Sequence, residues 1–226
     1  MKTWPFVGRE KEARYVRTEL EAGRSVVLTG IHGIGRTALA RHVAEEMARE
    51  WLFAFVDFDR GPAEVWRGLF ERFFPRAHAR RRGAARPVQW LRYRVSSGRL
   101  EDGRRHAVVL DNVARLTAQR LDSVRRLREG FQVVAILEGF VLEEDRAGLC
   151  ASLRARPPLE LRHLSARATL GFLEECSRRH GFGWGPGEIR GVARAVDGFP
   201  LGMREAVEAE LRRRRRGAPG LAREAR

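Results

Sequence analysis

The residues from Ser25 to Ala40 change from an apolar run to a glycine-rich loop and then to a stretch that is compatible with a helix. Gly30, Gly35 and Thr37 have the spacing of the phosphate-binding pattern G-x-x-x-x-G-K-[ST]. Glycines let a backbone turn through positive φ and approach an anion closely. The N–H groups of such a loop converge on phosphate oxygens, and the helix that follows adds the positive end of its dipole. The stretch therefore predicts phosphate binding.

Each position of this loop has an expected role. The expected nucleotide-binding residues are Gly30, Gly33, Ile34, Gly35, Arg36, Thr37 and Ala38. Thr37 would place its hydroxyl on Mg²⁺, and Arg36 stands where the pattern has lysine and would supply the cation. Arginine keeps the charge but is a wide planar fork, whereas lysine is a compact point charge. We therefore expect nucleotide binding without efficient hydrolysis, and an Arg36 side chain that swings away from the phosphates is the alternative.

A second part of the predicted site is the acidic residue Asp111, which follows the apolar run Ala107–Leu110. An aspartate at the carboxyl end of a buried strand is the Walker B pattern of phosphate-loop proteins. Such an aspartate lies across the sheet crevice from the hydroxyl of the loop and can hold Mg²⁺ through water. Asp111 and Thr37 are therefore the predicted magnesium ligands.

The elements that position these residues alternate between strand and helix. Strands are expected at residues 26–28, 52–58, 106–112, 131–137 and 158–161. Helices are expected at residues 11–22, 38–49, 63–74, 88–96, 116–128 and 141–153, and then, with no further strand, at 166–180, 189–196 and 200–216. Strands that alternate with helices predict an α/β fold with a parallel sheet that is covered on both faces.

The composition describes a chain of ordinary domain size with a strong positive charge. Its 226 residues are 43% hydrophobic and carry a formal net charge of +15, almost all of it from arginine. This charge permits contact with nucleic acid, although arginine bias is also typical of a high-GC or thermophilic source. No apolar run reaches membrane-spanning length and no signal peptide is recognisable. Two isolated cysteines, Cys150 and Cys176, indicate a reducing, cytoplasmic setting.

Four short motifs occur in a fixed order along the chain. Phe6–Glu10 reads FVGRE, the phosphate loop and the Walker B aspartate follow, and Gly198–Leu201 reads GFPL. Together they resemble the STAND branch of the AAA+-related P-loop ATPases, which includes the NB-ARC proteins and the archaeal-type ATPases. In that family GLPL lies in a helical lid, and Leu161–Ser165 resembles the "L..LS" entry into that lid. The resemblance extends over about residues 5–211.

The resemblance implies a five-stranded parallel sheet of order 5-1-4-3-2 with a C-terminal helical lid. It divides the chain into a nucleotide-binding α/β domain (1–164), a lid subdomain (165–216) and a basic tail (217–226) that looks frayed. The implied cofactors are ATP or ADP with Mg²⁺, held between sheet and lid. By the family pattern, Val7 and Arg9 lie near the adenine and phosphates, and Pro200 lies near the adenine.

Three positions depart from the family pattern. Arg36 replaces the lysine, and Asn112 stands at the usual acidic position after Asp111, where an amide cannot act as a general base. Glu138 follows the fourth strand, where relatives often sense the terminal phosphate with polar or basic side chains, and we expect it to face solvent. All three favour nucleotide binding with weak or absent hydrolysis, unless Glu138 or Asp57 substitutes for the missing base.

The leading hypothesis is a cytoplasmic nucleotide switch, in which ATP or ADP closes the lid and changes a surface for a separate effector or sensor protein. The chain is then a minimal switch or a fragment. The alternative is a degenerate scaffold that binds nucleic acid or protein through arginines. The candidate contacts are Arg80, Arg81, Arg82, Arg212, Arg213 and Arg214. A third hypothesis, a working ATPase stimulated by DNA or by homo-oligomer formation, would use an arginine from a neighbouring subunit.

Overall fold

The computed structural model describes residues 4–75, 86–97 and 103–217. The described residues form two compact units. The sheet unit contains residues 11–32 and 36–161, and the helical unit contains residues 4–10, 33–35 and 162–217. The predicted domain boundary between residues 164 and 165 stays a prediction. Of the predicted tail, Gly217 ends the last helix and the remaining residues lie outside the described part.

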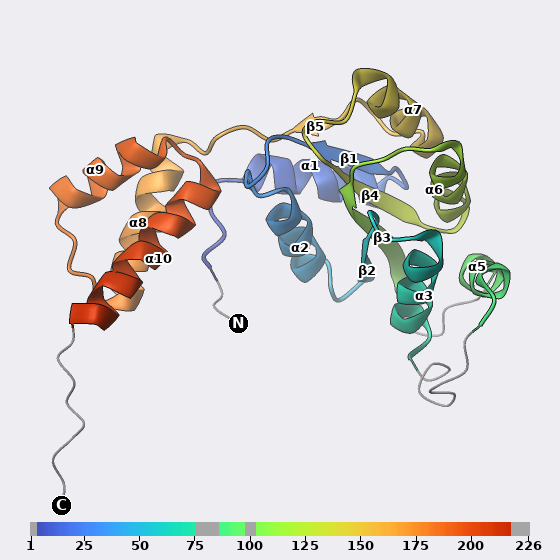
Figure 1. Cartoon of the computed structure of the whole chain (residues 1–226), viewed down its shortest axis with the longest axis horizontal. Helices are drawn as coiled ribbons and strands as arrows, with labels where there is room; N and C mark the ends of the chain where they lie inside the picture. Colours follow the sequence, from blue (N-terminus) through green and yellow to red (C-terminus); the bar gives the residue numbers. More distant parts are fainter. Residues whose placement is uncertain (1–3, 76–85, 98–102, 218–226) are drawn as a thin grey trace, which may run out of the picture. The chain divides into compact units, whose positions relative to one another are not determined.

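A parallel sheet forms the centre of the sheet unit (Figure 1). Its strands are β1 (Val26–Thr29), β2 (Trp51–Asp57), β3 (Arg105–Val113), β4 (Gln132–Leu137) and β5 (Leu159–Glu160). They lie in the order β2-β3-β4-β1-β5, and every neighbouring pair is parallel. The α/β fold class and the order 5-1-4-3-2 expected from the sequence are therefore confirmed. The carboxyl ends of these strands meet at one edge, and the candidate site is built there.

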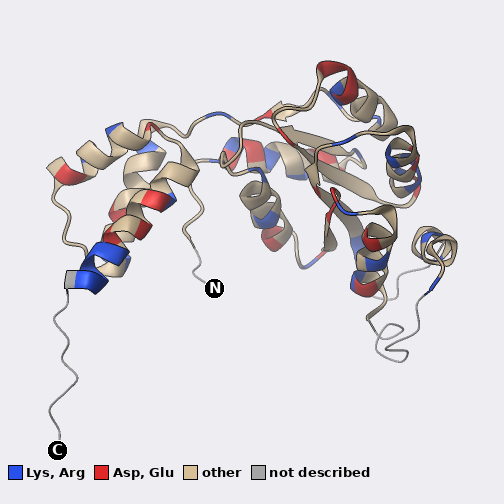
Figure 2. Cartoon of the chain, viewed as in Figure 1, with Lys and Arg blue, Asp and Glu red and all other residues tan. Residues whose placement is uncertain are grey.

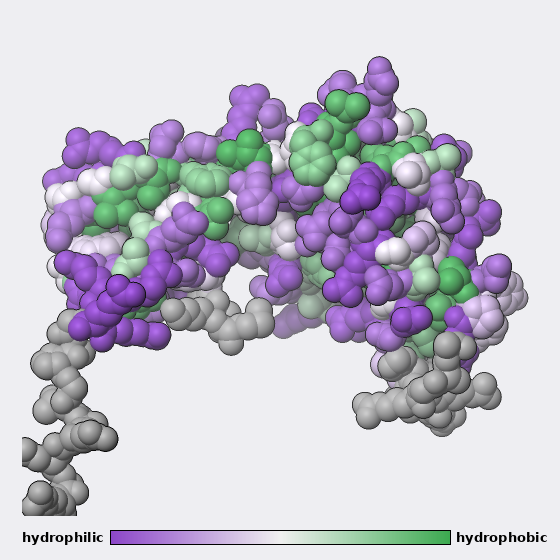
Figure 3. All heavy atoms as spheres, viewed as in Figure 1, coloured by the Kyte–Doolittle hydropathy of each residue, from purple (hydrophilic) through white to green (hydrophobic). Residues whose placement is uncertain are grey.

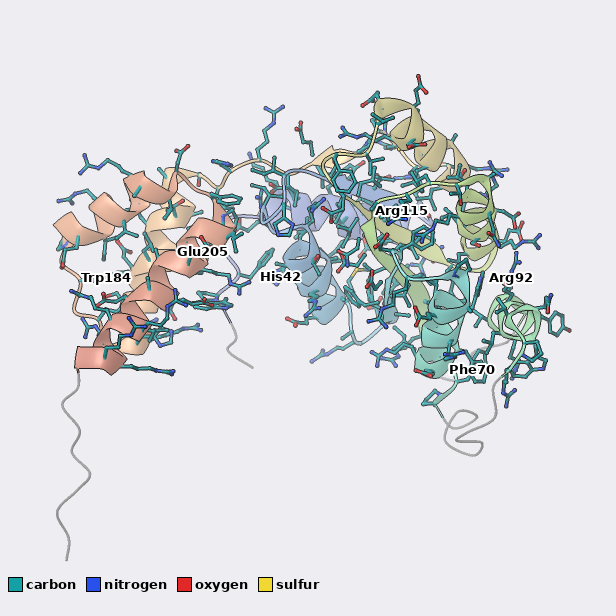
Figure 4. The ribbon with its side chains drawn as sticks, in the orientation of Figure 1. His42, Phe70, Arg92, Arg115, Trp184 and Glu205 are labelled. Carbon is teal, nitrogen blue, oxygen red and sulfur yellow. The ribbon has the colours of Figure 1, made fainter. Side chains whose placement is uncertain are left out.

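Helices cover both faces of this sheet (Figure 1). They are α1 (Glu10–Glu21), α2 (Arg36–Glu46), α3 (Pro62–Phe73), α5 (Val88–Ser97), α6 (Ala118–Gly130) and α7 (Glu143–Leu153). The middle of the sheet is buried on both sides, so β1 and β4 read as continuous apolar runs rather than alternating ones. Residues of α3, α5, α6 and α7 share one hydrophobic cluster with the sheet. Figure 4 labels two of the side chains on these helices, Phe70 on α3 and Arg92 on α5.

The helical unit contains α8 (Ala166–His180), α9 (Pro186–Val196) and α10 (Pro200–Gly217). Ser165 caps α8, because its hydroxyl accepts a hydrogen bond from the Ala168 N–H at 3.3 Å. The three helices enclose a hydrophobic cluster centred on Leu173, Cys176 and Val207. Trp184, labelled in Figure 4, packs against this cluster with its ring 4.8 Å from that of Phe182.

The turn before α10 depends on a close approach between two backbone segments. Gly198 has a φ of 68°, which favours glycine. A Cβ atom added at Gly198 would lie 2.2 Å from the carbonyl oxygen of Leu164. The Leu164 N–H in turn donates to the Gly198 carbonyl at 2.9 Å. The GFPL motif and the entry to α8 therefore fit together only with glycine at this position.

Within the part of the chain that is described, none of the helices has the length and apolar character needed to span a membrane. Both cysteines are free thiols, with Cys176 buried and Cys150 partly buried.

Candidate phosphate-binding site

The loop between β1 and α2 has a backbone that only glycines adopt readily. Gly30, Gly33 and Gly35 have φ values of 141°, 80° and 98°. Helix α2 begins at Arg36, so the N–H groups of its first turn have no partner within the helix. An anion at the start of α2 would meet these N–H groups and the positive end of the helix dipole. The conformation and position of the loop suit a phosphate group.

The two predicted magnesium ligands lie in contact with each other. Thr37 is in the first turn of α2, and Asp111 is near the carboxyl end of β3. The Thr37 hydroxyl donates to the Asp111 carboxylate, with its Oγ1 atom 3.1 and 3.2 Å from the two carboxylate oxygens. Mg²⁺ prefers oxygen ligands and is usually held by one or two carboxylates together with waters and substrate phosphates. A hydroxyl and a carboxylate beside a phosphate loop fit that requirement.

No group of three or more His, Cys, Asp or Glu side chains gathers as a metal site among the described residues. Mg²⁺ usually keeps several waters, so a magnesium ion at Thr37 and Asp111 would be completed by water and by a bound phosphate.

Arg36 is paired inside the protein. Its guanidinium, 6% exposed, donates to the Leu137 carbonyl and to the Glu138 carboxylate at 2.9 Å. The side chain of Glu138 is 18% exposed. The expectation that Glu138 faces solvent is therefore wrong. The physical reason is that a buried guanidinium needs acceptors, and the end of β4 offers both a carbonyl and a carboxylate.

Asn112 is held by a neighbouring strand. Its φ is 57°, and its side-chain amide donates to the Asp57 carboxylate at 3.2 Å. Burial alone would raise the pKa of Asp57, but hydrogen bonds from Asn112, the Asp59 N–H and Arg60 outweigh burial and lower the pKa. Asp57 is therefore a stabilised anion that already accepts several hydrogen bonds.

Arg9 joins two segments of the helical unit. Its buried guanidinium donates to the Ile34 carbonyl at 3.1 Å and to the Arg162 carbonyl at 2.6 Å. Ile34 is itself fully buried. Val7 packs against the hydrophobic cluster of this unit, and Pro200 is the first residue of α10. The predicted adenine-side residues thus all belong to the helical unit, and Arg9 reaches the phosphate loop through the Ile34 carbonyl.

Gly33 of the phosphate loop lies against Phe199 and Leu201 of the GFPL motif. A Cβ atom added at Gly33 would lie 2.7 Å from the Cβ of Leu201 and 2.9 Å from the ring of Phe199. The middle of the phosphate loop and the turn before α10 therefore lie against each other within the helical unit. The remaining predicted loop residue, Ala38, is in the first turns of α2.

The arginines predicted to contact nucleic acid are in two groups. Arg80, Arg81 and Arg82 lie outside the described residues. The second group, Arg212 to Arg214, is at the end of α10, where Figure 2 shows a concentration of basic residues and Figure 3 shows a hydrophilic surface.

Glu210 neutralises part of this basic helix end. Its carboxylate accepts from Arg213 at 2.7 Å and from Arg214 at 2.6 Å, and these hydrogen bonds lower its pKa to about 2. Arg214 also donates to the carbonyls of Gly181 and Phe182. Arg212 lies 3.8 Å from Glu208. Of these three predicted nucleic-acid-binding arginines, Arg213 and Arg214 therefore already make hydrogen bonds within the helical unit.

The contact that sequence reasoning missed is the pair of Arg36 and Glu138. A signal for it was present, because Arg36 is wider than the lysine of the family pattern and Glu138 places an opposite charge at the end of the fourth strand. The carboxyl ends of parallel strands meet at one edge of the sheet, so a pair between the two side chains could have been considered.

Solved structures share this fold. The Aeropyrum pernix ORC1 protein in complex with DNA is 18% identical with a TM-score of 0.67, and 95% of this chain matches 62% of that one. Cdc6p from Pyrobaculum aerophilum is 13% identical with a TM-score of 0.64, over 96% of this chain and 64% of that one. The Aeropyrum pernix ORC2 protein, in ADPNP and ADP complexes, is 16% identical with a TM-score of 0.54, over 97% of this chain and 73% of that one. The chain thus spans about three fifths of the length of ORC1 and Cdc6p.

A comparison with curated proteins finds no match. The family model described as the AAA ATPase domain matches residues 5–141, which is more than half of the 226 residues. That range contains the phosphate loop, Thr37 and Asp111, and the parallel sheet around them has the expected strand order. The chain therefore belongs to the AAA ATPase domain family, within the AAA+-related P-loop ATPases.

Proposed function

We propose that the chain binds ATP or ADP together with Mg²⁺ at the phosphate loop, and that it works as a nucleotide-dependent switch with slow or absent hydrolysis. The observation that carries the proposal is the contact of Thr37 with Asp111 at 3.1 Å beside a glycine loop of positive φ. The ORC2 protein of the same fold is known in ADPNP and ADP complexes, which is consistent with this ligand class.

The polar groups around the loop support slow turnover. Asn112 offers an amide where a general base would be needed, and an amide cannot accept the proton of an attacking water. The two carboxylates that could replace it are engaged, because Asp57 accepts from Asn112 and Glu138 pairs with Arg36. Neither is placed as a free base. In this proposal the state of the switch depends on which nucleotide is bound, and not on how fast the nucleotide is hydrolysed.

The switch part of the proposal resembles the STAND pattern. Gly33 lies against Leu201, and Arg9 holds the carbonyl of Ile34, so the middle of the phosphate loop is built into the helical unit. A phosphate that orders this loop would change the conformational equilibrium of the helical unit. A separate effector or sensor protein would bind one of these conformations in preference to the other. The cytoplasmic setting that the free cysteines suggest is part of the same proposal.

A calorimetric titration tests the proposal. ATP and ADP are titrated into the wild type and into Thr37→Ala, each with and without Mg²⁺. Micromolar binding of the wild type, about −8 kcal/mol, is expected, with a loss of at least about tenfold in Mg²⁺-dependent affinity in Thr37→Ala. Protein that is folded and free of carried-over nucleotide but gives no binding would overturn the proposal.

Thr117→Ala is the matched control. Thr117 caps α6 through its hydroxyl, which accepts from the Arg120 N–H at 3.4 Å. Its loss is expected to cost about 1 kcal/mol of stability and to leave nucleotide affinity unchanged. A weakened affinity in both threonine variants would show that the effect of Thr37→Ala is one of stability.

A second candidate function, nucleic-acid binding, is favoured by the arginines that end α10 and by the DNA complex of the ORC1 protein. Glu210 already neutralises part of that charge, which makes it the weaker proposal. A salt titration of duplex-DNA binding separates the two. If Arg212 contacts phosphate, then Arg212→Ala should weaken binding on any sequence and lower the salt slope by about one.

A further inference from the structure

Arg36 and Glu138 form a closed ion pair beside the phosphate loop. The guanidinium of Arg36 is 6% exposed and lies 2.9 Å from the Glu138 carboxylate, and its other terminal nitrogen donates to the Leu137 carbonyl. To reach a phosphate, Arg36 would have to leave both partners. That movement would strand a carbonyl and a partly buried carboxylate without their donor.

The pair lies next to the loop that it affects. Leu137 ends β4, which pairs with β1, and β1 leads into Gly30. A Cβ atom added at Gly139 would lie 3.3 Å from the Gly30 carbonyl oxygen, so the segment after Glu138 runs against the first glycine of the loop. Arg36 itself begins α2 at the other end of the loop.

The pair changes the charge that a nucleotide meets. A phosphate loop with a free lysine adds one positive charge for the β- and γ-phosphates. Here the carboxylate of Glu138 cancels the charge of Arg36, so the two side chains together add none. Each additional phosphate carries more negative charge toward a carboxylate. The electrostatic repulsion from Glu138 is therefore largest for the terminal phosphate of a triphosphate.

We propose that Glu138 is a specificity-determining residue, which holds Arg36 away from the terminal phosphate and makes the site prefer a nucleoside diphosphate over the triphosphate. This inference rests on the proposed nucleotide binding. It predicts a resting state loaded with diphosphate. It also predicts that release of Arg36 from Glu138 is the step that admits a triphosphate.

Glu138→Gln tests the inference, because glutamine keeps an oxygen for Arg36 but removes the charge. Dissociation constants are measured by calorimetry for Mg²⁺·ADP and for an ATP analogue with a non-hydrolysable β–γ bridge. The wild type should bind ADP about tenfold more tightly than the analogue. In Glu138→Gln the dissociation constant of the analogue, divided by that of ADP, should fall by about tenfold, which corresponds to about 1.4 kcal/mol.

Glu144→Gln is the matched control, since Glu144 is an exposed glutamate in the first turn of α7 and its loss changes the net charge equally. The control should leave the ratio of the two constants unchanged. If Glu138→Gln is poorly folded by circular dichroism, the double variant R36K/E138Q replaces it, because that variant has no buried guanidinium to satisfy. The double variant should show the same shift or a larger one.

The outcomes separate the inference from the proposed function. If both ligands bind but their ratio is the same in the wild type, Glu138→Gln and R36K/E138Q, the inference is wrong and nucleotide binding stands. An equal shift in Glu138→Gln and Glu144→Gln also overturns it, since general charge would then be the cause. If neither ligand binds any of these folded proteins, the proposed function fails and the inference fails with it.

Discussion

Asn112 donates its side-chain amide to the carboxylate of Asp57 across 3.2 Å, between the ends of two neighbouring parallel strands. By the family pattern that the sequence resembles, the first residue stands at the usual acidic position, and the second is a carboxylate expected as a possible substitute for that acid. The structure shows that they are one hydrogen-bonded pair. A change at one of these positions therefore also alters the surroundings of the other.

Asn112→Asp is expected to lower stability near pH 7 without creating an efficient base. Aspartate tolerates the positive φ of this position, so the backbone is not strained. The new carboxylate would face Asp57 at about the present 3.2 Å spacing, and two like charges about 4 Å apart repel by about 1 kcal/mol even in bulk water. Urea unfolding at pH 7 and at pH 4 should show a deficit at pH 7 that shrinks at pH 4, where one carboxyl takes up a proton.

The exchanged double variant D57N/N112D is the control for this pair. It restores one amide and one carboxylate, and it should recover most of the stability that Asn112→Asp loses. A double-mutant cycle gives the coupling directly. A coupling of zero would mean that the two side chains do not interact in solution.

Gly198→Ala is expected to destabilise the protein by about 3 kcal/mol, which sums the strain of positive φ and overpacking against the Leu164 carbonyl. Gly181→Ala serves as the comparison. Gly181 has a φ of 64°, but a Cβ atom there would meet nothing within 4 Å. It should cost about 1 kcal/mol from backbone strain alone. Equal losses in urea unfolding would contradict the close approach of the two segments.

Glu210 should make stability depend on acid pH. Its pKa is lowered from 4.5 to about 2, first by the hydrogen bond from Arg213 and then by that from Arg214. A lowered carboxyl pKa gives a stabilisation that is complete above the unfolded pKa near 4.5 and is lost as the pH falls toward 2. Thermal unfolding of Glu210→Gln and the wild type should therefore differ by a few degrees at pH 7, and the two should converge as the pH falls from 4.5 to about 2. A difference that stays constant over this range would rule out the linkage.

Cys176 should be almost inert toward thiol reagents in the folded protein. Burial raises its pKa to about 11, so that only about 0.1% of it is thiolate at pH 8. In a Cys150→Ser background, labelling with a chromogenic disulfide should be slow in buffer and fast in denaturant. Comparable rates in the two solvents would show that the core around Cys176 opens readily.

Much of the fold could be predicted because its signals are local. The apolar runs that become β1, β3 and β4 are continuous, as central parallel strands require, and the glycines of the phosphate loop mark the junction of strand and helix. Thr37 and Asp111 could be predicted as neighbours, because the carboxyl ends of parallel strands meet at one edge of the sheet.

The partners of long side chains could not be predicted in the same way. Arg36 reaches Glu138 across a sequence separation of 102 residues, and Arg9 reaches the Arg162 carbonyl across 153 residues. The periodicity of the sequence does not predict such a contact, because a long, flexible guanidinium side chain can donate to any acceptor within its reach. The fold brings these groups together, and burial then requires that they pair.

The Arg9 contact also has a consequence for the order of events during synthesis on the ribosome. Two contacts of residues 4–10 are made with residues that emerge much later: Trp4 packs on Phe172, and Arg9, which also donates to the Ile34 carbonyl, donates to the Arg162 carbonyl. The intervening sheet unit contains its own hydrophobic core and can collapse first. These two contacts therefore form only after more than a hundred further residues have been added, when Arg162 and α8 have emerged. A long-range closure of this kind is slow, and it places the completion of the helical unit late in folding.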